Sequence, residues 1–198
     1  KEGPYENFYD NGQLKCKISY KDGKMDGPWI EYYPDGQLEM KGSYTDGEED
    51  GPWKKYYDNG QLEMKGSYKK GERDGLWELY YINGQLGSKS SYTDGKWDGS
   101  YEKYYDNGQL KSKISYKDGK MDGPWVSYDP DGQLKEKGSF KNDKRDGPWI
   151  EYYDNGQKME ERFYMDGKET KYRHIQFPRD PDRTTTTPST DTEPKTKE

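Results

Sequence analysis

Carboxylates are the most abundant side chains in this sequence that are able to do acid–base chemistry or bind a metal ion. Five of them recur at one repeated position directly before a glycine: Asp22, Asp46, Asp94, Asp118 and Asp166. Aspartate before glycine is favoured in turns because its side chain bonds to its own backbone. A glycosidase needs one distinct pair of carboxylates in a cleft, and no pair stands out here. The recurrence indicates turns rather than catalysis.

The other reactive side chains are isolated. The chain has a single histidine, His174, and a single cysteine, Cys16. No Ser-His-Asp arrangement or metal-ligand spacing can be assembled around them, and the Asp-Gly-Lys-Met-Asp-Gly loops lack the glutamate and spacing of a calcium loop. We expect His174 to be solvated and Cys16 to be a small core residue, as Met40 and Met64 would be at the same repeat position. We predict no enzyme, catalytic residue, metal or cofactor.

The composition places limits on the fold and the partners. Of the 198 residues, 27% are hydrophobic and 36% charged, but 16% are aromatic, so we expect an ordered protein with a thin aromatic core. The net charge of −6 is well mixed along the chain, which argues against nucleic acid and anionic membrane as partners. No long apolar run is present, so we predict no membrane insertion.

Glycine recurs every 24 residues in two parallel series, one from Gly12 to Gly156 and the other from Gly3 to Gly147. A fixed period of this size indicates one supersecondary unit that is copied and stacked. Within one unit, the aromatic run 29–33 predicts a strand that ends in a tight hairpin around Gly36. Residues 37–44 then alternate between apolar and polar side chains, which predicts a second strand with one buried face. A longer polar connection through 47–51 leads to the next unit.

These elements predict an all-β fold, a single-layer antiparallel meander of about seven hairpin repeats and about 14 strands, shaped as a twisted elongated ribbon or half-pipe. The array covers 1–170, an extra edge strand is expected within 171–177, and 178–198 is expected to be a flexible Thr/Pro-rich tail. In the seventh unit the apolar residues move by one place, to Met159 and Phe163, which predicts a bulge or a terminal cap.

The candidate partner-binding surface lies in the middle of the array, where the repeat is least regular. It comprises these five aromatic residues: Trp97, Tyr101, Tyr81, Tyr105 and Trp77. Trp97 occupies a turn position that other units fill with methionine, glutamate or arginine. Two interpretations stay open: its indole covers a thinned core, or it is an exposed contact for a partner. The periodic tryptophans as a set are expected to form the core, with a fraction of the rings exposed.

The unit Gly-Pro-Trp-x-x-Tyr-Tyr-Asp-Asn-Gly-Gln-Leu, followed by Lys-x-Ser-Tyr-Lys-Asp-Gly-Lys-x-Asp, resembles the variant MORN repeat of bacterial proteins often catalogued as YwqK-family antitoxins. The resemblance implies β-hairpin arrays that serve in protein recognition and assembly. It departs from the eukaryotic MORN pattern, so phospholipid binding is not implied. The pattern is also similar to choline-binding and glucan-binding wall repeats, although those place tryptophan directly beside the tyrosine pair.

We therefore predict a non-enzymatic scaffold for a protein partner, antitoxin-like or associated with the bacterial cell envelope or surface. The alternatives are a module that binds cell-wall glycan, and a structural subunit of a surface filament. Because the chain begins at Lys1 in phase with the repeat, an upstream segment is expected, and a cytoplasmic location stays open. The sequence does not determine the oligomeric state.

Overall fold

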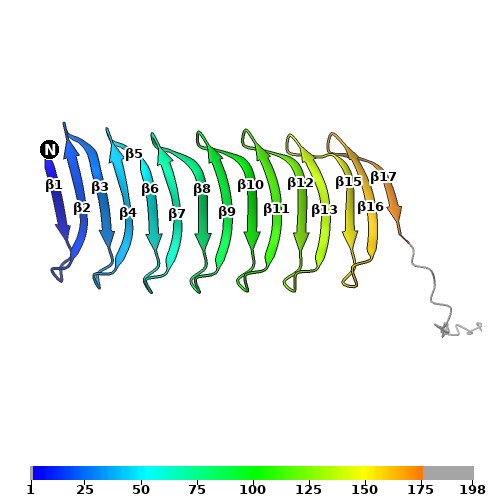
Figure 1. The fold of residues 1–198 in the computed structure, drawn as a ribbon, viewed down its shortest axis with the longest axis horizontal. Coiled ribbons are helices and arrows are strands. Elements are labelled where there is room, and N and C mark those ends of the chain that lie inside the picture. Colours follow the sequence, from blue (N-terminus) through cyan, green and yellow to red (C-terminus); the bar gives the residue numbers. More distant parts are fainter. Residues whose placement is uncertain (1, 176–198) are drawn as a thin grey trace, which may run out of the picture.

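The computed structural model describes residues 2–175, which form one open β-sheet (Figure 1). Its strands are β1 (Gly3–Phe8), β2 (Leu14–Lys21), β3 (Lys24–Tyr32), β4 (Leu38–Thr45), β5 (Glu48–Glu49), β6 (Gly51–Tyr56), β7 (Leu62–Lys69), β8 (Glu72–Tyr80), β9 (Leu86–Thr93), β10 (Lys96–Tyr104), β11 (Leu110–Lys117), β12 (Lys120–Tyr128), β13 (Leu134–Lys141), β14 (Lys144–Arg145), β15 (Gly147–Tyr152), β16 (Lys158–Met165) and β17 (Lys168–His174). Strands that are consecutive in the chain are antiparallel neighbours, apart from the two-residue β5 and β14, which pair only with the strand before them. The predicted single-layer meander is confirmed.

The two kinds of connection are the reverse of the prediction. The tight turn is the one at Asp46 and Gly47, where two residues with φ of 52° and 91° join Thr45 to Glu48. Positive φ at both positions defines a type I′ hairpin turn, and Asp-Gly is a favoured pair for it. The connection around Gly36 is the longer one: it runs from Tyr33 to Gln37, and the Tyr33 N–H donates to the Gln37 carbonyl at 2.8 Å. Gly36 does have the predicted positive φ, 86°.

The second glycine series lies at a bulge within a strand rather than in a connection. Gly27 has a φ of 102°, and the register between β2 and β3 shifts there, between Ile18 and Tyr20. In two units the strand breaks at the same place, at Asp50 and at Asp146, which separates β5 from β6 and β14 from β15. The aromatic strand therefore begins earlier than expected. These two breaks, together with β17, explain why the sheet has 17 strands instead of the expected 14 or so.

One face of the sheet, called the core face here, carries a row of aromatic rings, mostly tryptophans, with a glycine, serine or isoleucine between them in most units. Across consecutive strands, Trp29 lies opposite Gly42, and Trp53 opposite Gly66. A Cβ on Gly42 would be 2.3 Å from Cε2 of Trp53, so the glycine leaves the space that the next indole fills. Trp53 is 4% exposed. A single layer thus builds a core because each ring covers the repeat before it.

At the C-terminal end, β16 keeps its register with β15, whereas its pairing with β17 has a bulge, where the register shifts between Phe163 and Tyr164. Lys158 lies opposite Tyr152, the same register by which Leu38 lies opposite Tyr32, so the strand does not slip. The faces exchange their chemistry instead, and Arg162 takes the core-face position of the glycines. β17 pairs with β16 and begins earlier than predicted, at Lys168. Residues 176 and 177 of the predicted edge strand, and the predicted tail 178–198, lie outside the described residues.

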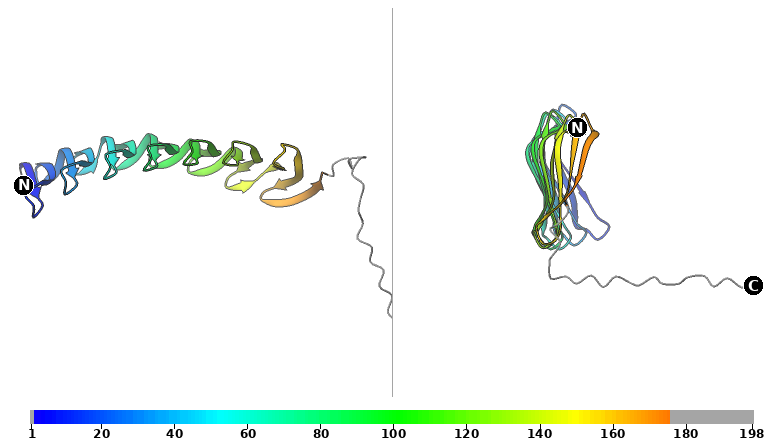
Figure 2. Two further views of the ribbon diagram at one scale, coloured as in Figure 1. Left: turned by 90° about the horizontal axis from the view of Figure 1, so that it is seen from below. Right: turned by 90° about the vertical axis from the view of Figure 1, so that its right-hand side faces the viewer.

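Figure 2 shows the sheet as an elongated ribbon whose strands are bowed and whose long axis bends gently. This agrees with the predicted twisted ribbon or half-pipe, and it follows from the right-handed twist of each strand. Within residues 2–175 there is no helix long and apolar enough to cross a membrane. The sheet presents two broad faces, and their side chains differ.

Candidate interaction surface

Trp97 packs on the core face against three tyrosines. Its ring centroid lies 4.8 Å from that of Tyr116, 5.7 Å from Tyr101 and 6.3 Å from Tyr92. Of the two sequence interpretations, the geometry favours an indole that covers a thinned core. The side chain is still 38% exposed, so it remains accessible from solvent.

The equivalent position in other units explains this packing. Arg73 and Arg145 place their guanidinium groups over Trp77 and Trp149, at 4.3 and 4.0 Å from the ring centroids. In the fifth unit the larger ring stands at Trp97 and the smaller one at Tyr101. Trp97 therefore takes the place of the arginine of other units, and Tyr101 takes the place of their tryptophan.

The remaining residues of the predicted partner-binding surface have structural positions. Trp77 is wrong as a contact residue, because its side chain is 0% exposed beneath its neighbours. The hydroxyl groups of Tyr81 and Tyr105 donate to the carbonyls of Tyr104 and Tyr128, at 2.8 and 2.9 Å. Each bond joins one repeat to the next, 23 residues on. Partner binding by Trp97, Tyr101, Tyr81 and Tyr105 stays a prediction.

The opposite face, called the lysine face here, carries a row of charged and aliphatic side chains that runs across the whole sheet. The cross-strand pairs define it residue by residue, one from each long strand. In order, it reads Glu6, Lys17, Ile30, Lys41, Lys54, Lys65, Glu78, Lys89, Glu102, Lys113, Val126, Lys137, Ile150, Glu161 and Arg173. Most cations in this row have an acidic or aliphatic neighbour on each side.

Lys54 breaks this rule. The equivalent positions in the other units hold a carboxylate or an aliphatic side chain: Glu6, Ile30, Glu78, Glu102, Val126 and Ile150. Lys54 instead lies directly between Lys41 and Lys65, so that three cations are adjacent across β4, β6 and β7. Like charges directly opposite each other destabilise a sheet. This arrangement needs an explanation other than stability.

Ion pairs balance the positive charge of only some of the lysines in this row. Lys17 binds Glu6 at 3.1 Å, Lys113 binds Glu102 at 2.8 Å, and Lys65 binds Glu78 at 2.6 Å. Within residues 2–175, neither Lys41 nor Lys54 has an ion-pair partner, and both are exposed. Lys89 and Lys137 of the same row also have no ion pair within residues 2–175, but glutamates flank Lys89 and aliphatic side chains flank Lys137. Lys41 and Lys54 are the unpaired lysines that lie directly opposite each other.

The pKa values report the same pairing. Hydrogen bonds from Lys113 and Tyr104 hold the pKa of Glu102 below its usual value. Burial opposes ionisation of Glu78, but hydrogen bonds from Lys65 and Tyr80 outweigh it, and the pKa is again lowered. Burial and the hydrogen bond to Glu102 raise the pKa of Tyr104 to about 12. In the middle of the row, carboxylates and lysines thus neutralise one another.

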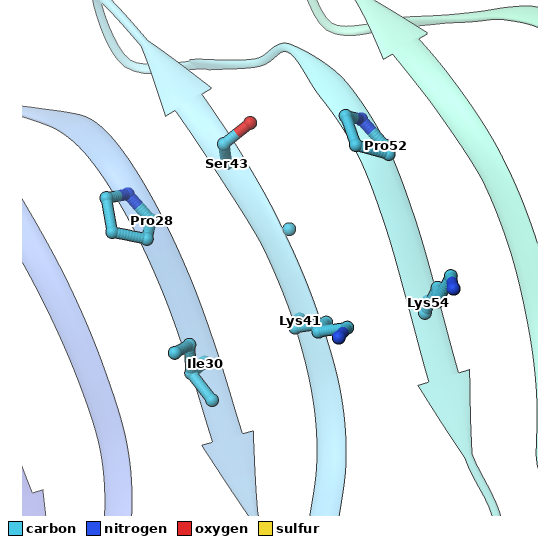
Figure 3. A pocket seen from close by; sticks show the side chains of 7 residues that line it. Pro28, Ile30, Lys41, Ser43, Pro52 and Lys54 are labelled. Carbon is cyan, nitrogen blue, oxygen red and sulfur yellow. The ribbon is translucent and has the colours of Figure 1, made fainter.

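A shallow groove of about 450 Å³ lies beside the unpaired lysines (Figure 3). Figure 3 shows two rows of side chains across β3, β4 and β6. One row holds Pro28, Ser43 and Pro52; the other holds Ile30, Lys41 and Lys54. Gly42 also lines the groove, which has apolar walls with two ammonium groups at one side.

The strand break beside the groove is fixed by a serine. The Ser43 hydroxyl donates to the Asp50 carbonyl, and the Asp50 N–H donates back to the Ser43 carbonyl at 3.0 Å. This pair of bonds sets the point at which β6 resumes after β5. Pro52 follows directly in β6, where a residue without an N–H suits a strand start. The local sequence thus positions one wall of the groove.

The same groove occurs a second time, 96 residues further along the chain. It is lined by Pro124, Val126, Lys137, Ser139, Pro148 and Ile150, and its volume is about 290 Å³. There the residue equivalent to Lys54 is Ile150, and Lys137 places its Nζ 5.6 Å from the ring centre of Tyr152. The two grooves share their shape but differ in charge, which provides a control within one chain.

Sequence reasoning predicted that one face of the sheet is polar and includes Lys41, but it missed the row of lysines across that face. Lysine recurs every 24 residues from Lys17 to Lys137, and this series is visible in the sequence. Lys54 belongs to the other strand of the hairpin, so only the register places it between Lys41 and Lys65. Among residues 2–175, no group of three or more histidine, cysteine, aspartate or glutamate side chains is arranged to hold a metal ion. Cys16 is buried as expected, and His174 is exposed as expected.

Comparison with known proteins gives one informative result. The model of the MORN repeat variant matches residues 1–22, 25–46, 49–70, 97–118, 121–142 and 145–166. The stretch between the third and fourth matches still forms the same hairpin, β8 and β9. No curated protein matches the chain.

Among solved structures, one described as "Crystal Structure of TcdB2-TccC3-Cdc42" matches with 12% identity and a TM-score of 0.20. The match covers 83% of this chain and 12% of that one. At this TM-score the similarity supports no conclusion about this chain.

Proposed function

This chain belongs to the MORN repeat variant family, and from that premise we propose that it is a non-enzymatic repeat scaffold that binds a protein partner along its lysine face. MORN repeats form scaffolds that often mediate protein or membrane interactions. The observation that carries the proposal is the continuous row of side chains from Glu6 to Arg173 on an open sheet. Such a row offers an extended surface rather than an enclosed reaction site.

The core face supports the choice of the opposite face. Its tryptophans pack on one another: Trp29 and Trp53 meet edge to face at 5.2 Å and 76°, and Trp125 and Trp149 stack at 5.1 Å and 22°. Trp149 is 2% exposed and Trp77 is fully buried, so neither ring offers a flat surface to a sugar. Glycan binding relies on stacking against exposed rings, so the burial of these two rings argues against the glycan alternative at their positions; Trp97, which is 38% exposed, differs from them.

The proposal is testable by photo-crosslinking with the full chain. A photoreactive amino acid would replace Lys113 on the lysine face or, as the matched control, Lys103 on the opposite face; both side chains are exposed. We expect a defined protein adduct from the native source at position 113 and none at position 103. Adducts at neither position, together with retention on a cell-wall polysaccharide, would favour the glycan function and defeat this one.

The antitoxin-like role, the filament subunit and the envelope or surface location stay predictions. Each has its own measurement. Co-expression with a candidate toxin tests the first, the dependence of particle size on protein concentration tests the second, and fractionation of the native cells tests the third. The tryptophan packing and the lysine row are compatible with all three, so these measurements decide between them.

A further inference from the structure

We propose that the groove formed by β3, β4 and β6 binds an acidic protein segment, with one aliphatic side chain seated between Pro28 and Pro52 and carboxylates on Lys41 and Lys54. The inference deepens the proposed function, since it names the chemistry of the partner. It rests on three features of the described residues: the unpaired charge, the shape of the groove, and the comparison with the second groove.

The charge indicates an anionic ligand. Lys54 lies between two other lysines, and Lys41 has Lys54 and Ile30 as its cross-strand neighbours. Neither Lys41 nor Lys54 has a carboxylate partner among residues 2–175, whereas Lys17, Lys65 and Lys113 each have one. A bound carboxylate would relieve the repulsion in the free protein. Relief of this repulsion on binding would therefore add to the affinity for an acidic partner.

The groove indicates an aliphatic anchor. Pro28, Ile30 and Pro52 form apolar walls, and the backbone of Gly42 lies between them at the floor. Within this groove, Pro28 and Pro52 are exposed and face the same side as the two lysines (Figure 3). A side chain the size of leucine would cover this apolar surface while its neighbouring carboxylates reach the ammonium groups.

The chemistry fits a peptide segment better than a membrane surface. Further along the lysine face, Glu78 and Glu102 flank Lys89, so the excess of positive charge does not continue. An anionic bilayer needs a broad basic area, and the chain as a whole carries a charge of −6. A local basic cluster beside an apolar groove instead matches a short acidic segment with one apolar residue.

The test uses the full chain and a fluorescein-labelled peptide in which one leucine has two glutamates on either side. Binding is followed by fluorescence anisotropy at low salt. We expect the double variant K41Q/K54Q to weaken binding roughly fivefold to tenfold, since each exposed charge pair contributes modestly. The variant K137Q in the second groove should bind as the wild type does. A peptide with serine in place of leucine should also bind more weakly.

Several results would overturn the proposal. These are no binding of the leucine peptide at up to about 1 mM, equal binding by K41Q/K54Q and the wild type, an equal loss in K137Q, or tight binding to phosphatidylserine vesicles that Lys41 and Lys54 control. Circular dichroism confirms that each variant is folded. If peptide binding fails while the adduct at position 113 still forms, the groove assignment is wrong and the scaffold function stands. If no adduct forms at position 113 while the peptide still binds, the groove assignment stands and the proposal of a partner along the whole lysine face is wrong.

Discussion

Reversal of one charge, Lys54→Glu, should stabilise this protein even though Lys54 is the native residue. The substitution removes two like-charge contacts across the sheet and replaces them with opposite-charge contacts to Lys41 and Lys65. It also restores an acidic residue at a position where Glu6, Glu78 and Glu102 stand in other units. A stability gain from a reversal at a native site would show that Lys54 is retained for another reason.

The magnitude follows from the neighbours. A cross-strand pair is worth about 0.2–1 kcal/mol, and exposed pairs lie in the lower part of that range. Lys65 already holds Glu78 at 2.6 Å, so most of the gain comes from Lys41, which has no partner of its own within 2–175. We expect about 1 kcal/mol in the free energy of unfolding, or a rise in Tm of about 3 °C for an array of this length.

The assay is thermal unfolding of the full chain at low salt and in about 1 M NaCl, where charges are screened within about 3 Å. The matched control is Lys89→Glu, because Lys89 lies between Glu78 and Glu102, and reversal there places three carboxylates side by side. That variant should lose a similar amount of stability. The reasoning fails if Lys54→Glu lowers Tm, if its effect persists in high salt, or if both variants change Tm in the same direction.

Three further predictions address the core and the pH dependence. Gly42→Ala should destabilise the fold by about 1–3 kcal/mol in urea unfolding, because its Cβ would meet the Trp53 ring at 2.3 Å. Gly87→Ala, whose nearest contact is 3.3 Å away on Tyr81, should be nearly neutral. Equal effects of the two substitutions would contradict the packing described for Trp53. Trp97→Ala should cost about 2 kcal/mol, less than for a fully buried ring, and Trp97→Arg should recover part of it by covering Tyr101 and Tyr116 as Arg73 covers Trp77 and Tyr92; no recovery would contradict the equivalence of the two positions. Glu102 and Glu151 should act oppositely with pH. Hydrogen bonds from Lys113 and Tyr104 lower the pKa of Glu102, so its contribution to stability is present at neutral pH and is lost as the pH falls through its folded pKa. Burial, Glu160 and Glu136 raise the pKa of Glu151, so Glu151→Gln should stabilise the protein at pH 7 but not well below that pKa. Unfolding curves of Glu102→Gln and Glu151→Gln with the same pH profile would exclude this.

The periodic part of the fold was predictable because its cause is local. Residues 37–44 alternate between apolar and polar side chains, and period two places Leu38, Met40 and Tyr44 on one face. The glycine at position 42 has a cause that only the structure shows, namely the Trp53 ring from the next repeat. Where that next ring is Tyr101, Ser90 fits opposite it, which explains the serine in the thinned core.

The connections were assigned in the wrong order because both carry similar turn signals. Asp35-Gly36 and Asp46-Gly47 are the same dipeptide, but only the second has positive φ at both residues. The difference arises from the hydrogen-bond register between the strands, which the dipeptide alone does not determine. The strand breaks at Asp50 and Asp146 were likewise not predictable from the dipeptide, since an Asp-Gly pair occurs at the same position in units whose strand is unbroken.

Two departures from the repeat, Trp97 and Lys54, show how an irregular residue in an array can be interpreted. At Trp97 the departure is compensated next to it: a smaller ring at Tyr101 accepts the larger one, and the tyrosines around it keep their contacts. At Lys54 nothing compensates, because the neighbours on both sides remain lysines. The core face must fill its volume, so changes there come in matched sets. The lysine face has no such constraint, since each side chain meets only its cross-strand neighbours and solvent. An uncompensated change on that face is therefore the better indicator of a binding site, and it directs attention from the central tryptophan to the groove beside Lys54.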